Sequence, residues 1–206
     1  MDTARGVRAT AFLCLAWIPA VAAAPKTFTI DGTSTATAHV GKTGLGSFAG
    51  HEHLVLAQDL QGEVVLDSED LSKSSVDLII KTRSLTVSEK GEPEGDAAKV
   101  QEAMRGPSVL DAARFATIHF GSQAVSGKQT APGSYELLVT GEFSLHGVVK
   151  TFKVPVQVTV QGTALTASGK LTVKQTDFGI EPTTAAGGLV KVEDEVAISF
   201  RIGGKS

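Results

Sequence analysis

Cysteine is almost absent from this chain of 206 residues. The one cysteine, Cys14, lies in an apolar N-terminal stretch, where Phe12 and Leu13 stand at positions that a lipoprotein signal gives to small residues. If that stretch is removed, the remaining chain can form neither a disulfide nor a thiolate metal site. The stability of the mature protein must then come from an ordinary hydrophobic core.

A long hydrophobic run is also missing. Arg5 and Arg8 precede the apolar run ATAFLCLAW (residues 9–17), and AVAAAP (residues 20–25) offers small residues for cleavage. The run is too short to span a bilayer, so we favour a signal peptide at residues 1–23 over the alternative of a membrane anchor. The sequence therefore predicts a periplasmic or secreted protein with no transmembrane segment in the mature chain.

Neither a basic excess nor a recognised catalytic motif is present. The formal net charge is −3, and a protein with this charge does not attract the negatively charged phosphate backbone, so nucleic acid is excluded as a partner. No serine lies in a Gly-x-Ser-x-Gly motif, and the glycines of GKTGLGSFAG (residues 41–50) lead into a predicted strand rather than a helix. We therefore predict no enzymatic activity and no cofactor.

Alternation of apolar and polar residues dominates what is there. Period-two patterns over residues 135–145, 152–161 and 195–202 each place apolar side chains on one face, which predicts half-buried antiparallel strands. Weaker patterns of the same kind cover residues 27–31, 34–40, 53–57, 60–67, 75–83, 117–125 and 165–175. So many strands in one domain favour a barrel slightly over a sandwich. The pattern alone cannot tell a packed interior from a hollow one.

One segment has helical character. Asp96 can cap a helix over residues 97–105, and Gly106 with Pro107 ends it. We interpret residues 96–115 as a short helical insertion between two strands.

Histidines are the main candidates for chemistry. If residues 51–57 form a strand, His51 and His53 share one face and could together bind a metal, with a third ligand from His119 or His39. The alternative is that they are polar residues at the rim of a barrel. His146 precedes Gly147 at the end of a predicted strand, and we interpret it as a turn residue.

Several stretches occur together in an order that is specific. They are IDGTSTATAHVGKTG (30–44), FAGHEHLVLAQDLQGEVVLD (48–67), VDLIIKTRSLTV (76–87), SVLDAARFATIHFGS (108–122), VTGEFSLHGVVKTFKVPV (139–156) and KQTDFGIEP (174–182). With these motifs the chain resembles the YceI-like family of exported lipid- or polyisoprenoid-binding proteins, over residues 26–203, with a Gly-His-x-His variant at His51 and His53.

The resemblance implies an all-β fold, a single antiparallel eight-stranded lipocalin-like barrel that encloses an apolar cavity. It also implies a non-enzymatic carrier that holds an amphipathic lipid, an isoprenoid above all, with His51 and His53 as head-group contacts. Two alternatives stay open, a metal- or haem-binding protein that uses these histidines and a stress-related protein with a packed barrel; a homodimer is compatible with each. The predicted cavity lining is Phe115, Ile118, Phe120, Leu137, Val139, Phe143, Val154, Val156, Val158, Phe178, Ile198 and Phe200.

Overall fold

The computed structural model describes residues 24–43, 52–90, 94–185 and 190–206. The predicted signal peptide (1–23), most of the glycine-rich stretch (44–50) and His51 lie outside the described residues. The strands are β1 (Lys26–Ile30), β2 (Thr35–Thr43), β3 (His53–Ala57), β4 (Leu60–Leu66), β5 (Ser75–Lys81), β6 (Thr86–Val87), β7 (Thr117–Ala131), β8 (Ser134–Leu145), β9 (Val148–Gln161), β10 (Ala164–Lys174), β11 (Thr184–Ala185) and β12 (Val190–Lys205). The helical elements are α1 (Asp96–Arg105) and the 3₁₀ turns η2 (Leu71–Lys73), η3 (Thr82–Ser84) and η4 (Thr176–Phe178).

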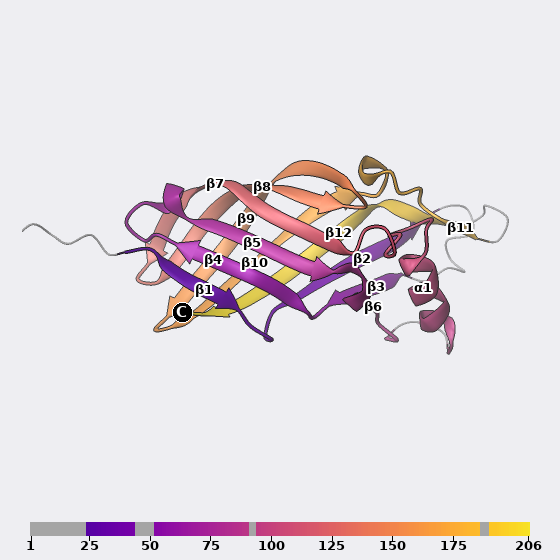
Figure 1. Cartoon of the computed structure of the whole chain (residues 1–206), viewed down its shortest axis with the longest axis horizontal. Coiled ribbons are helices and arrows are strands. Elements are labelled where there is room, and N and C mark those ends of the chain that lie inside the picture. Colours follow the sequence, from indigo (N-terminus) through magenta and orange to yellow (C-terminus); the bar gives the residue numbers. More distant parts are fainter. Residues whose placement is uncertain (1–23, 44–51, 91–93, 186–189) are drawn as a thin grey trace, which may run out of the picture.

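The strands form a closed antiparallel barrel with eight positions in its wall (Figure 1). β1 continues into β2, β3 into β4, and β5 into β6, so each of these pairs occupies one position, and β7, β8, β9, β10 and β12 occupy the others. β12 pairs with β2 and, through its last residues, with β1, which closes the circle. The predicted all-β, eight-stranded barrel is confirmed.

Alternation along each strand decides which side chains face the interior, because neighbouring residues of a strand point to opposite faces. In β8, Tyr135, Leu137 and Val139 are buried, whereas Glu136 and Leu138 between them are exposed. The faces that the sequence pattern marks as apolar are therefore the inner faces of the wall.

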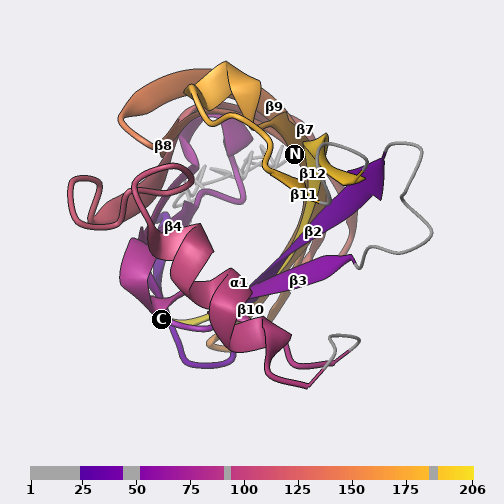
Figure 2. The same ribbon diagram turned by 90° about the vertical axis from the view of Figure 1, so that its right-hand side faces the viewer.

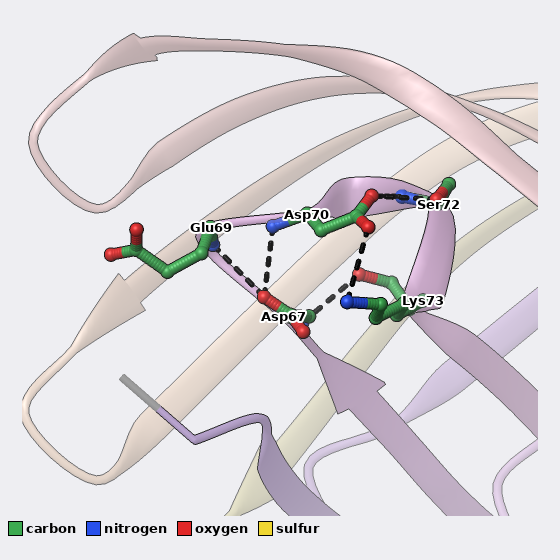
Figure 3. A network of polar contacts seen from close by, with 6 residues as sticks. Asp67, Glu69, Asp70, Ser72 and Lys73 are labelled. Atoms are coloured by element: carbon green, nitrogen blue, oxygen red, sulfur yellow. Dashed lines mark hydrogen bonds and ion pairs between the residues drawn. The ribbon is translucent and has the colours of Figure 1, made fainter. Parts of the chain in front are cut away.

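At one end of the barrel, the turn between β4 and β5 is organised by its own residues (Figure 3). Asp67, at the end of β4, is 5% exposed, and its Oδ1 accepts the backbone N–H groups of Glu69 and Asp70 at 3.0 and 2.9 Å. Its own N–H donates to the Ser74 hydroxyl at 3.0 Å. We call this the η2 end. Four buried residues of the hydrophobic core lie near it, and none of them is among the residues that line the interior cavity: Phe28, Ile30, Tyr135 and Leu165.

The opposite end, which we call the α1 end, carries the insertion between β6 and β7 (Figure 2). Residues Ala97, Val100 and Met104 form the stripe with which α1 packs against the core. The helix and the insertion at 96–115 are confirmed in position, but Gly95, in the left-handed conformation, is the N-cap and Asp96 is the first helical residue. A left-handed N-cap gives glycine the advantage over aspartate.

The wall also divides at the α1 end, between β9 and β10. These strands pair only as far as Val156 with Gly169, while β9 stays paired to β8, and β10 to β12, beyond that point. Pro155 explains the division. Its carbonyl oxygen points towards Gly169 of β10, and in a strand the N–H of a residue points to the same side as its C=O, so the N–H at position 155 would also face β10. Because proline has no N–H, it offers β10 no donor, and the ladder stops there.

Candidate functional site

A cavity of about 280 Å³ lies inside the barrel. It extends from Ser74 and Ser75 beside η2 to Met104 of α1, so it reaches towards both ends of the barrel. The interior is therefore packed in one part and hollow in another. The volume lies just below the usual range of small-molecule sites, about 300–1,000 Å³, which fits a narrow, chain-like occupant better than a bulky one.

The cavity wall is almost entirely hydrocarbon. Among its lining residues only Ser74, Ser75, His119 and Gln175 have polar side chains; the others are alanine, valine, leucine, isoleucine, methionine and phenylalanine. Gln175 donates its amide N–H to the carbonyl of Glu193 at 2.7 Å. A wall of this kind offers a ligand little hydrogen bonding, and its affinity must come from burying apolar surface, at about 25 cal/mol per Å².

Most of the side chains predicted from strand alternation do line this cavity. They are Ile118, Phe120, Leu137, Val139, Phe143, Val154, Val156, Val158, Ile198 and Phe200. Phe115 and Phe178 are not among the lining residues. Both precede or follow the long strands, so strand alternation could not place them; whether any of the twelve contacts a ligand stays a prediction.

Phe178 fills the division between β9 and β10. It is 0% exposed, and its ring lies 5.7 Å from the ring of Phe143 and 6.4 Å from that of Phe152, measured between centroids. The short helix η4 thus closes the wall where the β9–β10 ladder ends. Gln175 and Ile180, on either side of η4, line the cavity.

Asp194 of β12 holds η4 in place. Its Oδ1 accepts the N–H of Thr176 at 2.9 Å, and its Oδ2 accepts the Thr176 hydroxyl at 2.7 Å. The N–H bond first, and the hydroxyl bond next, lower the pKa of Asp194 below its ordinary value of 3.8. The carboxylate therefore stays charged, and η4 stays tied to β12, at neutral pH.

His146 joins η4 to the insertion. With φ of 51° at His146 and 75° at Gly147, these two residues form the tight turn between β8 and β9, as the sequence predicted. His146 Nδ1 donates to the Phe178 carbonyl at 3.0 Å, and its ring packs edge-on against Phe115, 4.7 Å between centroids. Phe115 is thus part of the structure that covers the α1 end rather than of the cavity wall.

Of the two predicted head-group residues, His51 and His53, the structure describes only His53. His53 pairs with Val40 across β2 and β3 and lies in phase with Val55 and Ala57. Because Val40, Val55 and Ala57 line the cavity, His53 is on the inner face of β3, at the α1 end. His51 lies outside the described residues.

Two other histidines of the described chain, His39 and His119, each bind a carboxylate. His39 Nε2 donates to Glu52 Oε2 at 2.8 Å, and His119 Nε2 donates to Asp77 Oδ2, also at 2.8 Å. A metal site at His51 and His53 would need one of these two histidines as its third ligand, but both are bound to carboxylates, His39 to Glu52 and His119 to Asp77. Within the described ranges, no group of three or more histidine, cysteine, aspartate or glutamate residues could hold a metal ion.

A model of the YceI-like domain matches residues 27–203 of this sequence. The chain belongs to the YceI-like family. The resemblance that the sequence motifs carry is thereby confirmed, and it covers almost the whole of the described structure. No curated protein matches the sequence.

Three solved structures share the fold. BcnA of Burkholderia cenocepacia is 22% identical, with a TM-score of 0.63 over 84% of this chain and 98% of its own. A polyisoprenoid-binding domain from Saccharophagus degradans is 14% identical, with a TM-score of 0.61 over 87% of this chain and 98% of its own. The YceI protein of Campylobacter jejuni is 14% identical, with a TM-score of 0.55 over 74% and 84%. At these identities the likeness concerns the fold.

Sequence reasoning missed the elements that close the α1 end. The β9–β10 division had a signal, Pro155 in the middle of an alternating strand, which marks the start of an unpaired edge. The tie between Asp194 of β12 and Thr176 of η4 joins residues 18 positions apart, and nothing in the sequence signalled it. None of the helices that the structure describes is both long and apolar enough to cross a membrane.

Proposed function

We propose that this protein is an exported, non-enzymatic carrier that holds an amphipathic lipid, an isoprenoid above all, with the hydrocarbon chain inside the barrel. The observation that carries the proposal is the cavity of about 280 Å³ with a lining of aliphatic and aromatic side chains. Each methylene that enters it contributes about 0.8 kcal/mol before the costs of association. The polyisoprenoid-binding domain from Saccharophagus degradans, which shares the fold, supports the choice of isoprenoids.

The cavity can be filled from its own wall to test this. Ala38, on the inner face of β2, lines the cavity, whereas its neighbour Thr37 points to the outer face. We expect Ala38→Phe to weaken the binding of geranylgeraniol at least tenfold and Thr37→Phe to leave it within twofold. Displacement of the apolar dye N-phenyl-1-naphthylamine measures both. Equal affinities for the two variants, or no binding by the unchanged protein, would contradict a carrier function.

Export is the second element of the proposal. It rests on the sequence of residues 1–23, for which cleavage is expected after Ala22 or Ala23. Mass spectrometry of the protein recovered from the periplasmic fraction measures the N-terminus. An uncut N-terminus on a cytoplasmic protein would overturn this element and leave the ligand proposal standing.

A further inference from the structure

The α1 end contains a cation, Arg105, that no carboxylate of the described residues neutralises. Arg105 is the last residue of α1, and one of its terminal nitrogens, Nη2, donates to the carbonyl of Leu85 at 3.0 Å. Its Nε is buried and has no hydrogen-bond partner. No carboxylate of residues 24–43, 52–90, 94–185 or 190–206 forms an ion pair with it.

An arrangement of this kind is expensive for a protein. The guanidinium group is charged at every physiological pH, and a partly buried charge costs free energy unless it is paired. Buried donors of native proteins have partners in the great majority of cases, so an orphaned one calls for an explanation. Arginine carries its donors in a planar fork that matches a carboxylate or a phosphate.

The position of Arg105 relates it to the cavity. Met104, the residue before it, and Leu85, whose carbonyl it binds, both line the cavity. Figure 2 shows α1 lying across the end of the barrel. Leu85 leads into β6, which pairs with β3, the strand whose inner face carries His53. Arg105 and His53 are not themselves among the lining residues, but both lie at the α1 end, next to residues that line the cavity.

We propose that Arg105 binds the anionic head group, a phosphate or a carboxylate, of the lipid whose chain occupies the cavity. The proposal rests on the proposed carrier function and adds the charge of its ligand. The hydrocarbon chain lies along the barrel from Met104 towards Ser74 and Ser75, and the anion stays at the α1 end. His53 lies on the inner face of β3 at that end and adds a polar side chain there.

A purely structural role is the competing explanation. Arg105 ties α1 to Leu85, and a cation in the last turn is favourable to the helix dipole. The chain offers a matched control for that role. Gln101, one turn earlier on α1, donates its Nε2 to the same Leu85 carbonyl at 3.0 Å and accepts the N–H of Val87 at 2.7 Å. Replacing Gln101 removes the bond to the Leu85 carbonyl, together with the bond from Val87, without removing a charge.

The experiment compares two ligands that differ only in the head group. Geranylgeraniol and geranylgeranyl phosphate are titrated into the full mature protein, with displacement of N-phenyl-1-naphthylamine as the readout. The variants are Arg105→Met, Gln101→Met and, as a control for net charge, Arg201→Met on the exposed outer face of β12. Hexadecanol and palmitate repeat the comparison for a carboxylate.

We expect the unchanged protein to prefer the phosphate. Arg105→Met should bind the phosphate roughly tenfold more weakly, the effect of one charge-assisted hydrogen bond, and should keep its affinity for the alcohol. Gln101→Met and Arg201→Met should keep the preference. Raising the salt concentration should weaken the phosphate alone, because screening acts on the charge.

The outcomes separate the two proposals. If the unchanged protein binds neither ligand, the carrier function itself is wrong. If it binds both but Arg105→Met keeps the preference for the phosphate, or weakens the phosphate and the alcohol equally, the head-group site is wrong and the carrier function stands. Arg105→Lys keeps the charge and covers the case in which Arg105→Met does not fold. It should retain a preference for the phosphate. If that preference is lost while binding of the alcohol is unchanged, the result would count for the fork geometry of arginine.

Discussion

The two ends of the barrel are organised in different ways. The turn at the η2 end is held by residues close together in the sequence, where Asp67 binds the backbone of Glu69 and Asp70, and buried core residues lie near it. The α1 end is closed by segments far apart in the sequence, with His146 bound to Phe178 and Asp194 to Thr176. It is also where the strands β9 and β10 separate and where Arg105 forms no ion pair with any carboxylate of the described residues. One end is built for stability, and the other holds the groups that a ligand could use.

The largest effects should come from removing a fully buried phenylalanine at each end. Phe28→Ala at the η2 end and Phe178→Ala at the α1 end each delete a ring that is 0% exposed, and each should lower the free energy of unfolding by about 3–5 kcal/mol. Urea unfolding measures this, with Val149→Ala, at a site 53% exposed, as a control that should change it by less than about 0.5 kcal/mol. Hydrogen exchange should quicken at Gly179 and Ile180 in Phe178→Ala alone; equal quickening in both variants would mean that the ends are not independent.

The next effect concerns the turn at the η2 end. Asp67→Ala leaves two backbone N–H groups without their acceptor, and it should lower the free energy of unfolding by about 2 kcal/mol. Binding of geranylgeraniol to the folded variant should stay within twofold. Glu69→Ala, whose exposed carboxylate makes no hydrogen bond within the described residues, is the matched control and should behave as the unchanged protein. A similar loss in both variants would show that the turn depends on charge rather than on the Asp67 acceptor.

A smaller effect on the free energy of unfolding is expected at the turn of His146 and Gly147, which contacts both η4 and Phe115 of the insertion. His146→Ala loses the hydrogen bond to the Phe178 carbonyl and places alanine at a positive φ, so it should cost about 2 kcal/mol of unfolding free energy. His146→Asn keeps a residue that tolerates this φ and should cost about 1 kcal/mol. Thermal unfolding with hydrogen exchange at η4 distinguishes the two variants. Equal costs would assign the whole effect to the lost hydrogen bond.

The smallest effect is the pH dependence of two exposed carboxylates, one at each end. The Ser72 hydroxyl first, and Lys73 next, lower the pKa of Asp70 below 3.8, as the bonds from Thr176 do for Asp194. A lowered folded-state pKa contributes stability that is complete above 3.8 and is lost as the pH falls through the folded-state value. Asp70→Asn and Asp194→Asn should each flatten the decline of stability in that acid range, in urea unfolding followed from neutral pH downwards. In Asp194→Asn alone, the Thr176 amide should exchange faster.

The strands of this protein could be predicted because each carries its own evidence. The alternation of residues 135–145 and 152–161 lies in contiguous sequence, and the burial of Tyr135, Leu137 and Val139 follows it. The turn at His146 was predicted as well, since it joins two strands with strong patterns. Ten of the twelve residues predicted as ligand contacts lie in such strands and line the cavity, whereas Phe115 and Phe178 belong to short connecting segments outside the lining; contact with a ligand stays a prediction for all twelve.

The sequence by itself determined the family, the barrel and the inward faces of its strands, because these follow from local periodicity and from motifs that are contiguous. Only the tertiary structure decided where the interior is hollow, since a void depends on how side chains of strands far apart in the sequence meet. It alone also decided that Phe178 closes the division beside Pro155 and that Arg105 has no carboxylate to neutralise it within the described residues. Whether a charge is paired depends on which residues become neighbours, and the chain brings those together only when it folds.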